Sequence, residues 1–143
     1  EIPIRSLCQH AVDKIAEPTR GDIHFSLVGD DLRILADADY IERAVDNLLL
    51  NACRYAKSTI QVTIRSVDNK VAIHIEDDGI GIPESEQKNI WERFYRGQNT
   101  TQTDGTGLGL YIVKKNTELL SGDIYFHSKV NEGSTFTIIL PIK

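Results

Sequence analysis

The chain has 143 residues, of which 41% are hydrophobic and 26% are charged, a composition typical of one folded domain and not of a disordered segment. Sixteen basic against 21 acidic residues give a net charge of −5, which argues against nucleic acid as a partner. The two cysteines, Cys8 and Cys53, are far apart and outside any C-x-x-C spacing, which argues against a disulfide framework or a thiolate zinc site.

The sequence contains no membrane span and no obvious targeting segment. No apolar run approaches the roughly 18 residues that cross a bilayer, and the first five residues do not resemble a signal peptide. Methionine is absent, even at position 1. We therefore expect a single, monomeric domain over residues 1–143, cytoplasmic and cut from a longer protein that is anchored in a membrane.

The first third of the chain predicts one helix and two short strands. Apolar residues at helical spacing predict a helix over residues 4–15. Alternating apolar residues at 23–27 and 32–34, with Gly29-Asp30 between them, predict two strands that pair as a hairpin.

The middle of the chain carries the most regular helical pattern. Seven apolar residues form one face of a predicted helix that begins at a cap, Asp37 or Asp39, and ends near Tyr55. Alternation over 58–67 and 71–75, across an Asp-Asn turn, predicts an antiparallel hairpin.

The last third predicts two helices, a loop and a hairpin. A short helix is expected over 86–94, a polar mobile loop over 97–104, and a longer helix over 107–120. Alternation at 124–126 and 136–140 predicts a closing hairpin. Together these elements predict an α/β fold in which helices stack on one face of a single sheet.

The stretch HIEDDGIGIPE places two adjacent acids at the exit of a predicted strand. Val71, Ile73 and Ile75 form its buried face, and because side chains alternate along a strand, Asp77 continues that face while Asp78 points to the other. Asp77 therefore needs hydrogen-bond donors, whereas Asp78 is expected to be solvated.

This alternation argues against a catalytic dyad, which needs both carboxylates aimed at the same atoms. An EF-hand calcium loop is also disfavoured, because its closing glutamate is replaced by Ser85. A simpler alternative stays open, in which Asp77 only caps nearby amides in a turn.

Two further stretches suggest phosphate and metal chemistry. The stretch GTGLGL, residues 105–110, lies at the start of a predicted helix. Glycines there leave the backbone amides uncovered by side chains, and such amides bind anions. The spacing matches neither the dinucleotide motif nor a P-loop. Asn47, Asn51 and Arg54 form one polar stripe on the predicted second helix. Asparagine oxygens suit Mg²⁺ and arginine suits phosphate, but such a stripe can also be merely solvated.

The four histidines show no metal-ligand spacing. His24, His74 and His127 occupy alternating polar positions on predicted strands, and His10 lies on the first helix. We interpret all four as surface or structural residues.

Taken together, the motifs resemble those of a known family. NLLLNACRYA, DDGIGIP, WERFYRG and GTGLGLYIV are similar to the N, G1, F and G2 boxes of the ATP-binding catalytic domain of sensor histidine kinases, within the wider group that includes gyrase, Hsp90 and MutL ATPase domains. Their order and spacing match over residues 39–113. The resemblance implies the Bergerat fold, an α/β two-layer sandwich with a mixed, largely antiparallel sheet covered on one face by three helices, and a lid at about 97–104.

The resemblance also implies roles for individual residues. Asp77 would accept a hydrogen bond from the adenine amino group, Asn51 would hold Mg²⁺, and Arg54 and Arg96 would contact phosphate, so that the last three serve catalysis. Tyr55 would border the ribose and base, although its place on the apolar face of the helix also suits a core residue. The other implied nucleotide-binding residues are Asn47, Gly79, Gly81, Ile82, Gly105, Thr106, Gly107, Leu108 and Gly109.

The identity of Asn47 bears on the reaction. Hydrolytic relatives carry a glutamate four residues before the metal asparagine, whereas a neutral amide cannot take a proton from water. Transfer to a protein nucleophile is therefore favoured. The resemblance implies a histidine as the acceptor, and none of the four histidines here has the surroundings of a family acceptor. The implied partners are ATP, a histidine-bearing dimerisation domain of the same kinase and a downstream response regulator. An ATP-driven conformational switch, an anti-sigma-type serine kinase and a binding module without catalysis are the alternatives.

Overall fold

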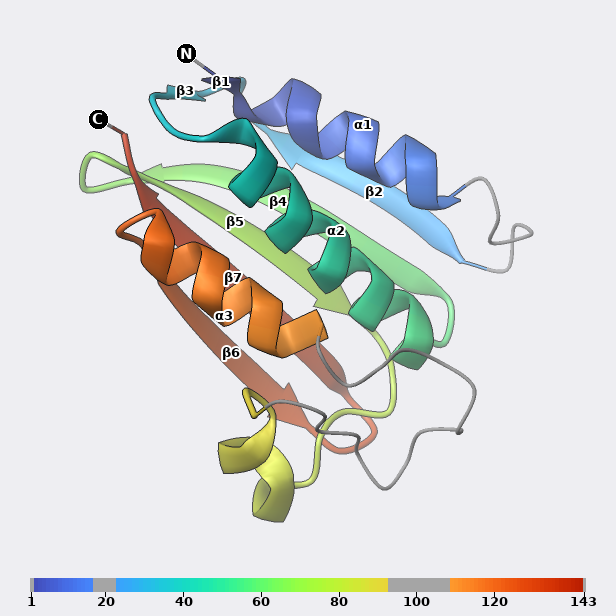
Figure 1. The fold of residues 1–143 in the computed structure, drawn as a ribbon. Helices are drawn as coiled ribbons and strands as arrows, with labels where there is room; N and C mark the ends of the chain where they lie inside the picture. The colour runs from blue at the N-terminus through green and yellow to red at the C-terminus, as the bar shows by residue number, and fades with distance from the viewer. Residues whose placement is uncertain (1, 17–22, 93–108, 143) are drawn as a thin grey trace.

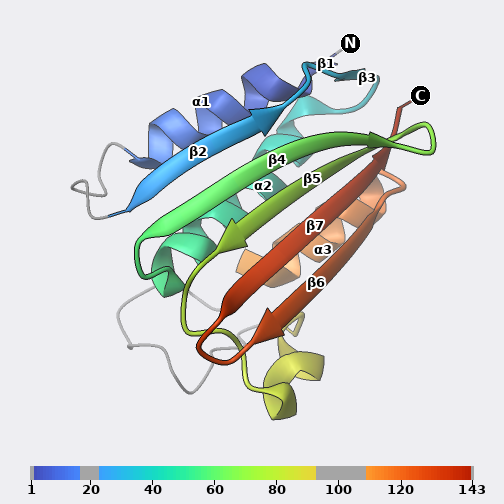
Figure 2. The same ribbon diagram turned by 180° about the vertical axis from the view of Figure 1, so that it is seen from behind.

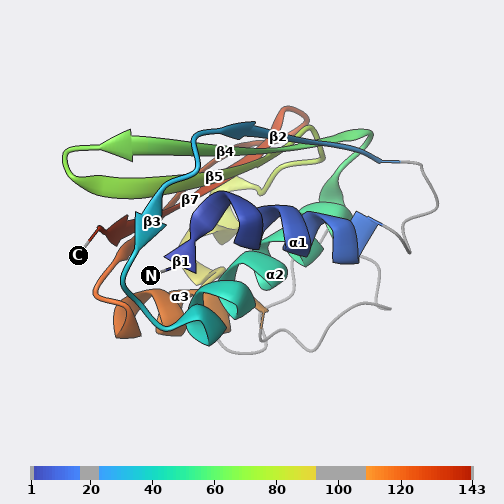
Figure 3. The same cartoon turned by 90° about the horizontal axis from the view of Figure 1, so that it is seen from above.

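The structure, a computed structural model, describes residues 2–16, 23–92 and 109–142. Within these ranges three α-helices lie side by side on one face of a five-stranded sheet (Figure 1), and no described helix covers the opposite face (Figures 2 and 3). This arrangement confirms the predicted α/β two-layer sandwich. None of the described helices combines the length and the apolar character that crossing a membrane would require.

The helices agree with the periodicity of the sequence. They are α1 (Ile4–Ala16), α2 (Ala38–Tyr55) and α3 (Gly109–Leu119). A 3₁₀ helix, η2 (Glu84–Asn89), lies where a short helix over 86–94 was predicted, and residues 93–94 of that prediction lie outside the described residues. Asp37 is the N-cap of α2, because its side chain accepts the amide of Asp39 at 3.0 Å. The predicted start of the third helix, residues 107–108, lies outside the described residues.

The main sheet is mixed and largely antiparallel. Its strands, in spatial order, are β2 (His24–Gly29), β4 (Thr59–Val67), β5 (Lys70–Asp77), β7 (Gly133–Pro141) and β6 (Asp123–Lys129). Among the strands that the structure describes, β2 and β4 are the one pair that runs parallel. Both predicted hairpins, β4–β5 and β6–β7, are present. The β4–β5 turn places Asp68 and Asn69 at φ 50° and 66°, as a tight hairpin turn requires.

The predicted hairpin between residues 23–27 and 32–34 is wrong. β2 pairs with β4 along all six of its residues, while β3 (Arg33–Ile34) pairs with β1 (Ile2–Pro3) in a separate two-stranded sheet. A two-residue strand offers a short ladder, whereas β4 satisfies the backbone of the whole of β2. Proximity in sequence was therefore the weaker criterion.

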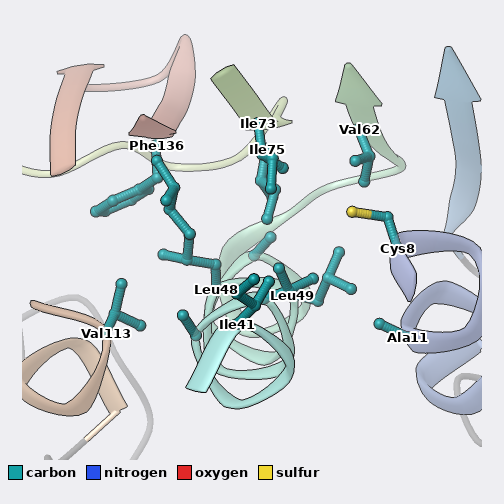
Figure 4. Close-up of a cluster of buried hydrophobic side chains, with 14 of the residues drawn as sticks. Cys8, Ala11, Ile41, Leu48, Leu49, Val62, Ile73, Ile75, Val113 and Phe136 are labelled. Carbon is teal, nitrogen blue, oxygen red and sulfur yellow. The ribbon is translucent and has the colours of Figure 1, made fainter. Parts of the chain in front are cut away.

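The hydrophobic core lies between the helices and the sheet. In Figure 4, Leu48 and Leu49 of α2 point toward Ile73 and Ile75 of β5, and Val113 of α3 lies beside them. All five are at most 1% exposed. Because α2 is packed against both the sheet and the two other helices, its end and the exit of β5 are fixed relative to each other.

Candidate functional site

Asp77 ends β5 on the helix-covered face of the sheet and is only 4% exposed. One carboxylate oxygen, Oδ1, accepts the amide of Gly79 at 2.8 Å. Burial raises the pKa of Asp77 to about 6, although backbone hydrogen bonds from Gly79 and Ser134 act to lower it. The predicted alternation is confirmed, and the carboxylate both caps the local turn and remains poorly solvated.

Asp78 is not the solvated side chain that the sequence predicts. Its Oδ1 accepts the amides of Lys57, Ser58 and Thr59 at 2.9, 3.0 and 3.1 Å, and its Oδ2 accepts the Ser58 hydroxyl at 2.7 Å. Partial burial acts to raise the pKa of Asp78, but the hydrogen bonds from Ser58, Thr59 and Lys57 outweigh it and hold the pKa well below its usual range. Asp78 thus joins the α2–β4 connection to the turn after β5.

Close packing leaves no room for a side chain at Gly79 or Gly81 in this turn. A Cβ on Gly79 would lie 2.0 Å from the carbonyl oxygen of Tyr55, at the end of α2. Gly81 has φ +74°, and a Cβ there would lie 2.0 Å from the carbonyl oxygen of Lys129. The turn after β5 is therefore held between the end of α2 and the β6–β7 hairpin.

The β6–β7 hairpin makes direct hydrogen bonds to this turn. The Asn131 amide donates to the Ile80 carbonyl at 2.8 Å, and the Ile82 amide donates to Ser128 Oγ at 2.7 Å. Ser128 also contacts Ser134, with 2.8 Å between their hydroxyl oxygens. Sequence reasoning missed both serines.

A usable signal for the serines was present in the sequence. Ser128 continues the inward face of Ile124 and Phe126, and Ser134 precedes Phe136 by two residues. Each is a polar residue at the end of an apolar stripe, which is the same pattern that identified Asp77.

The polar stripe of α2 lies beside the start of α3. Asn51 is 8% exposed, so this asparagine is not part of a solvated helix face. Asn47 Nδ2 donates to the Arg43 carbonyl at 2.9 Å, and Asn47 Oδ1 lies 3.6 Å from where a Cβ on Gly109 would stand. Arg54 Nε is buried and has no hydrogen-bond partner among the described residues.

Tyr55 and Ile82 complete the described part of the predicted site. Tyr55 is half-buried, and burial raises the pKa of its hydroxyl while Arg54 acts to lower it. This placement suits both a core residue and one that borders a ligand, so its role stays a prediction. Ile82 is 7% exposed and belongs to the hydrophobic core.

The remaining predicted residues lie outside the described residues: Arg96, Gly105, Thr106, Gly107, Leu108 and the lid at 97–104. The described ones come from three motifs that the fold brings together. The turn after β5 contacts α2 at Tyr55, and α3 begins beside Asn47. The convergence of these motifs on the C-terminal half of α2 supports a common site.

The histidines agree with their predicted structural or surface role. His10, His24 and His127 are exposed, and His74 Nδ1 lies 2.9 Å from Thr137 Oγ1 on the neighbouring strand. In the described ranges, histidine, cysteine and acidic side chains form no cluster of three or more that could hold a metal.

Comparison with known proteins agrees with this geometry. The model of the family described as histidine kinase-, DNA gyrase B- and HSP90-like ATPase matches residues 36–143. The adaptive-response sensory kinase SasA of Synechocystis is 32% identical over 148 residues, covering 99% of this chain and 38% of SasA. The sensor histidine kinase WalK of Bacillus subtilis is 34% identical over 119 residues, covering 79% of this chain and 20% of WalK.

Solved structures agree as well. The mycobacterial sensor histidine kinase MprB superimposes with a TM-score of 0.89 at 26% identity, covering 98% of this chain and 96% of that one. The catalytic domain of the histidine kinase ThkA gives 0.85 at 30% identity, covering 99% and 93%. The chain spans well under half the length of the curated relatives SasA and WalK. Since the family model covers most of the chain, the chain belongs to the histidine kinase-, DNA gyrase B- and HSP90-like ATPase family and is a catalytic domain of the sensor histidine kinase type.

Proposed function

We propose that this chain binds ATP with Mg²⁺ and donates the γ-phosphate to a histidine in a dimerisation domain of the same kinase, outside this chain. A response regulator would then receive the phosphate. The observation that carries this proposal is the Asp77 carboxylate, buried at the exit of β5 on the helix-covered face, close to the end of α2. ATP as substrate and two free thiols suit a cytoplasmic domain, the parent protein being anchored in a membrane.

Asp77 is suited to select adenine. Its Oδ1 is fixed by the Gly79 amide, so the carboxylate has a set direction before any ligand binds. A buried carboxylate gains most from a ligand that donates a hydrogen bond, and the exocyclic amine of adenine is such a donor. Guanine presents a carbonyl oxygen at the corresponding position. That oxygen has no proton to donate, and its partial negative charge would be repelled by the carboxylate.

The α2 residues fit a magnesium–triphosphate group. Asn51 carries a buried amide, and Asn47 has its Nδ2 engaged with Arg43, which leaves Oδ1 on the side of α3. Amide oxygens are hard ligands that suit Mg²⁺, and Arg54 suits phosphate. When bound, Mg²⁺ would neutralise charge on the phosphates. In the proposal Arg96 and the amides of Gly105, Thr106, Gly107, Leu108 and Gly109 also contact phosphate.

Asn47 favours transfer over hydrolysis. Its amide is neutral, and the nitrogen already donates to the Arg43 carbonyl, so the side chain has no means of accepting a proton from water. An imidazole acceptor needs no such base, because its ring nitrogen attacks through a free lone pair. The chain's part in the reaction is then to bind and orient the nucleotide and to present the γ-phosphate.

Calorimetric titration with ATP, ADP and GTP tests nucleotide selection. We expect binding of both adenine nucleotides and no detectable binding of GTP, because Asp77 accepts from the adenine amine. Equal affinities for ATP and GTP would contradict the role given to Asp77.

Phosphotransfer is tested with γ-labelled ATP and the histidine-bearing dimerisation domain supplied as a separate polypeptide. We expect label on that domain that is lost in acid and stable in base, as for phosphohistidine. Acid-stable label would indicate a serine kinase instead. Sustained ATP hydrolysis or nucleotide-dependent dimerisation by the chain alone would indicate the conformational switch.

A further inference from the structure

Three buried polar residues lie next to one another across β5, β7 and β6. The strand register places Asp77 opposite Ser134 and Ser134 opposite Ser128. They are 4%, 6% and 8% exposed. One step further into the sheet, on the same face, Ile75 and Phe136 are apolar and buried. Asp77, Ser134 and Ser128 therefore form a polar row, which borders the apolar face of the sheet at the end where Asp77 lies.

Hydrogen bonds link this row to the turn after β5. The Ile82 amide donates to Ser128 Oγ at 2.7 Å, and the Gln87 amide nitrogen, Nε2, donates to the carbonyls of Ile82 and Ser128 at 3.0 and 3.2 Å. Both backbone polar groups of Ile82 are thereby held by side chains. The turn that carries Gly79 and Gly81 is fixed at its far end by these bonds, just as Asp77 fixes its near end.

The hydroxyl of Ser128 also ties it to the start of β7. Its Oγ lies 2.8 Å from Ser134 Oγ, a contact in which either hydroxyl can be the donor, and it donates to the Gly133 carbonyl at 3.3 Å. Ser134 in turn stands opposite Asp77 in the strand register, and its backbone amide acts to lower the pKa of the Asp77 carboxyl. Ser128 therefore contacts both segments that border Asp77, which are the turn after β5 and the start of β7.

We propose that Ser128 is a positioning residue for purine recognition, which holds Ile82 and Ser134 so that the Asp77 carboxylate keeps the direction that an adenine amine requires, with Gln87 as its support. This inference deepens the proposed function and rests on it. Ser128 acts through its neighbours, since its own hydroxyl is engaged within the protein.

Loss of the Ser128 hydroxyl has a defined physical consequence. The Ile82 amide would lose its acceptor inside the protein, and a buried unsatisfied donor is costly enough to displace the turn. Asp77 would then have to be reordered at each binding event, and the ordering cost would appear as weaker affinity.

The first arm of the test measures the dissociation constant for ADP by calorimetry. Ser128→Ala is expected to weaken binding about tenfold, the order of one hydrogen bond, and Ser128→Thr, which keeps the hydroxyl, is expected to restore it. The matched control is Thr117→Val, which removes another buried hydroxyl, one that donates to the Val113 carbonyl at 2.7 Å within α3. That control should lose stability without losing affinity.

The second arm needs no nucleotide. NMR measures amide exchange at Ile82 and the carboxyl titration of Asp77 in the free protein. In Ser128→Ala we expect faster exchange at Ile82 and a higher Asp77 pKa, because a loosened Ser134 amide favours the charged carboxylate less. Thr117→Val should change neither signal.

The outcomes separate this inference from the proposed function. If folded Ser128→Ala binds ADP as the wild type does, or if Thr117→Val loses affinity equally, Ser128 is not a positioning residue. Should Ser128→Ala fail to fold, Gln87→Ala decides by the same measurements, since it removes the partly exposed support. If the wild type binds no adenine nucleotide, the proposed function fails, while the second arm still decides whether Ser128 positions Asp77.

Discussion

Asp77 and Asp78 are neighbours in the chain, yet their surroundings are opposite. Asp77 lies buried under the helices, where desolvation raises its pKa to about 6. Asp78 points to the α2–β4 connection and accepts hydrogen bonds from three backbone amides and one hydroxyl. The difference follows from strand alternation, because consecutive side chains leave a strand on opposite faces.

The comparison explains why only one of these two identical residues is proposed to bind a ligand. The oxygens of Asp78 already accept hydrogen bonds from the protein, so Asp78 is not needed as an acceptor for a ligand. Asp77 is charged at a position that solvates it poorly, and such groups mark candidate functional sites. In the proposed function, Asp77 therefore serves binding and Asp78 serves folding.

The largest expected effect comes from neutralising each acid in turn. Asp77→Asn should weaken ATP binding about 100-fold, the order of a hydrogen bond to a charged acceptor, while the protein stays folded. Asp78→Asn should chiefly lower the free energy of unfolding, by about 2 kcal/mol, because an amide nitrogen replaces one acceptor facing backbone donors. Calorimetry and urea unfolding measure the two effects.

Glu76→Gln is the control for both variants, since Glu76 is an exposed acid on the same strand. It should change neither quantity appreciably. Loss of stability without loss of affinity in Asp77→Asn, or the reverse in Asp78→Asn, would refute the division of roles.

The second prediction concerns the glycine that follows the two acids. Gly79→Ala would place a Cβ 2.0 Å from the Tyr55 carbonyl oxygen, so we expect a loss of about 2–3 kcal/mol in unfolding free energy. Gly109→Ala is the matched variant, because the nearest atom to its Cβ would be Asn47 Oδ1 at 3.6 Å. Alanine suits a helix, so that variant should be neutral or more stable. Equal losses in urea unfolding would show that the close contact with Tyr55 is not what requires glycine.

The third prediction uses the raised pKa of Asp77. Because its folded pKa of about 6 exceeds the ordinary aspartate value of 3.8, the folded state binds the proton more tightly, and this group's contribution to stability falls as the pH rises through that window. The stability of nucleotide-free Asp77→Asn relative to wild type should therefore rise between about pH 4 and 6, by roughly 2 kcal/mol, and then level off.

Urea unfolding of both proteins across this range measures the difference, in which the other titrating groups largely cancel. Asp78 has the opposite sign, since its lowered pKa contributes stability that is lost as the pH falls below its unfolded value. A wild-type minus Asp77→Asn difference that does not change with pH would argue against a poorly solvated Asp77.

The smallest expected effect concerns an acid that serves structure alone. Asp37→Ala removes the side-chain cap of α2 and should lower the unfolding free energy by about 1 kcal/mol. ATP affinity should not change, because the cap lies at the opposite end of α2 from Asn51 and Arg54. A loss of affinity on calorimetry would mean that the cap also orients the binding end of the helix.

Local patterns were sufficient where the deciding interaction is local. The cap at Asp37, the periodicity of α2, both hairpins and the inward direction of Asp77 all follow from the spacing of neighbouring residues, and the structure agrees with each. The motif order also predicted the family, which the family model confirms over residues 36–143.

Patterns failed where a partner distant in sequence decides. The pairing of β2 depended on β4, more than 30 residues away, and the donors of Asp78 come from the connection after α2. The close approach of Gly79 and Gly81 to the Tyr55 and Lys129 backbones likewise depends on segments distant in sequence.

By itself, the sequence determined the three α-helices, strands β2 and β4 to β7, and the face of its strand that each of Asp77, Ser128 and Ser134 occupies, because alternation and helical periodicity are properties of a few consecutive residues. Only the tertiary structure decided that these three side chains lie in one row across β5, β7 and β6, and that Asp78 is bound by amides. The physical reason is that strand order and register depend on the summed burial and hydrogen bonding of the whole sheet, which no single segment specifies.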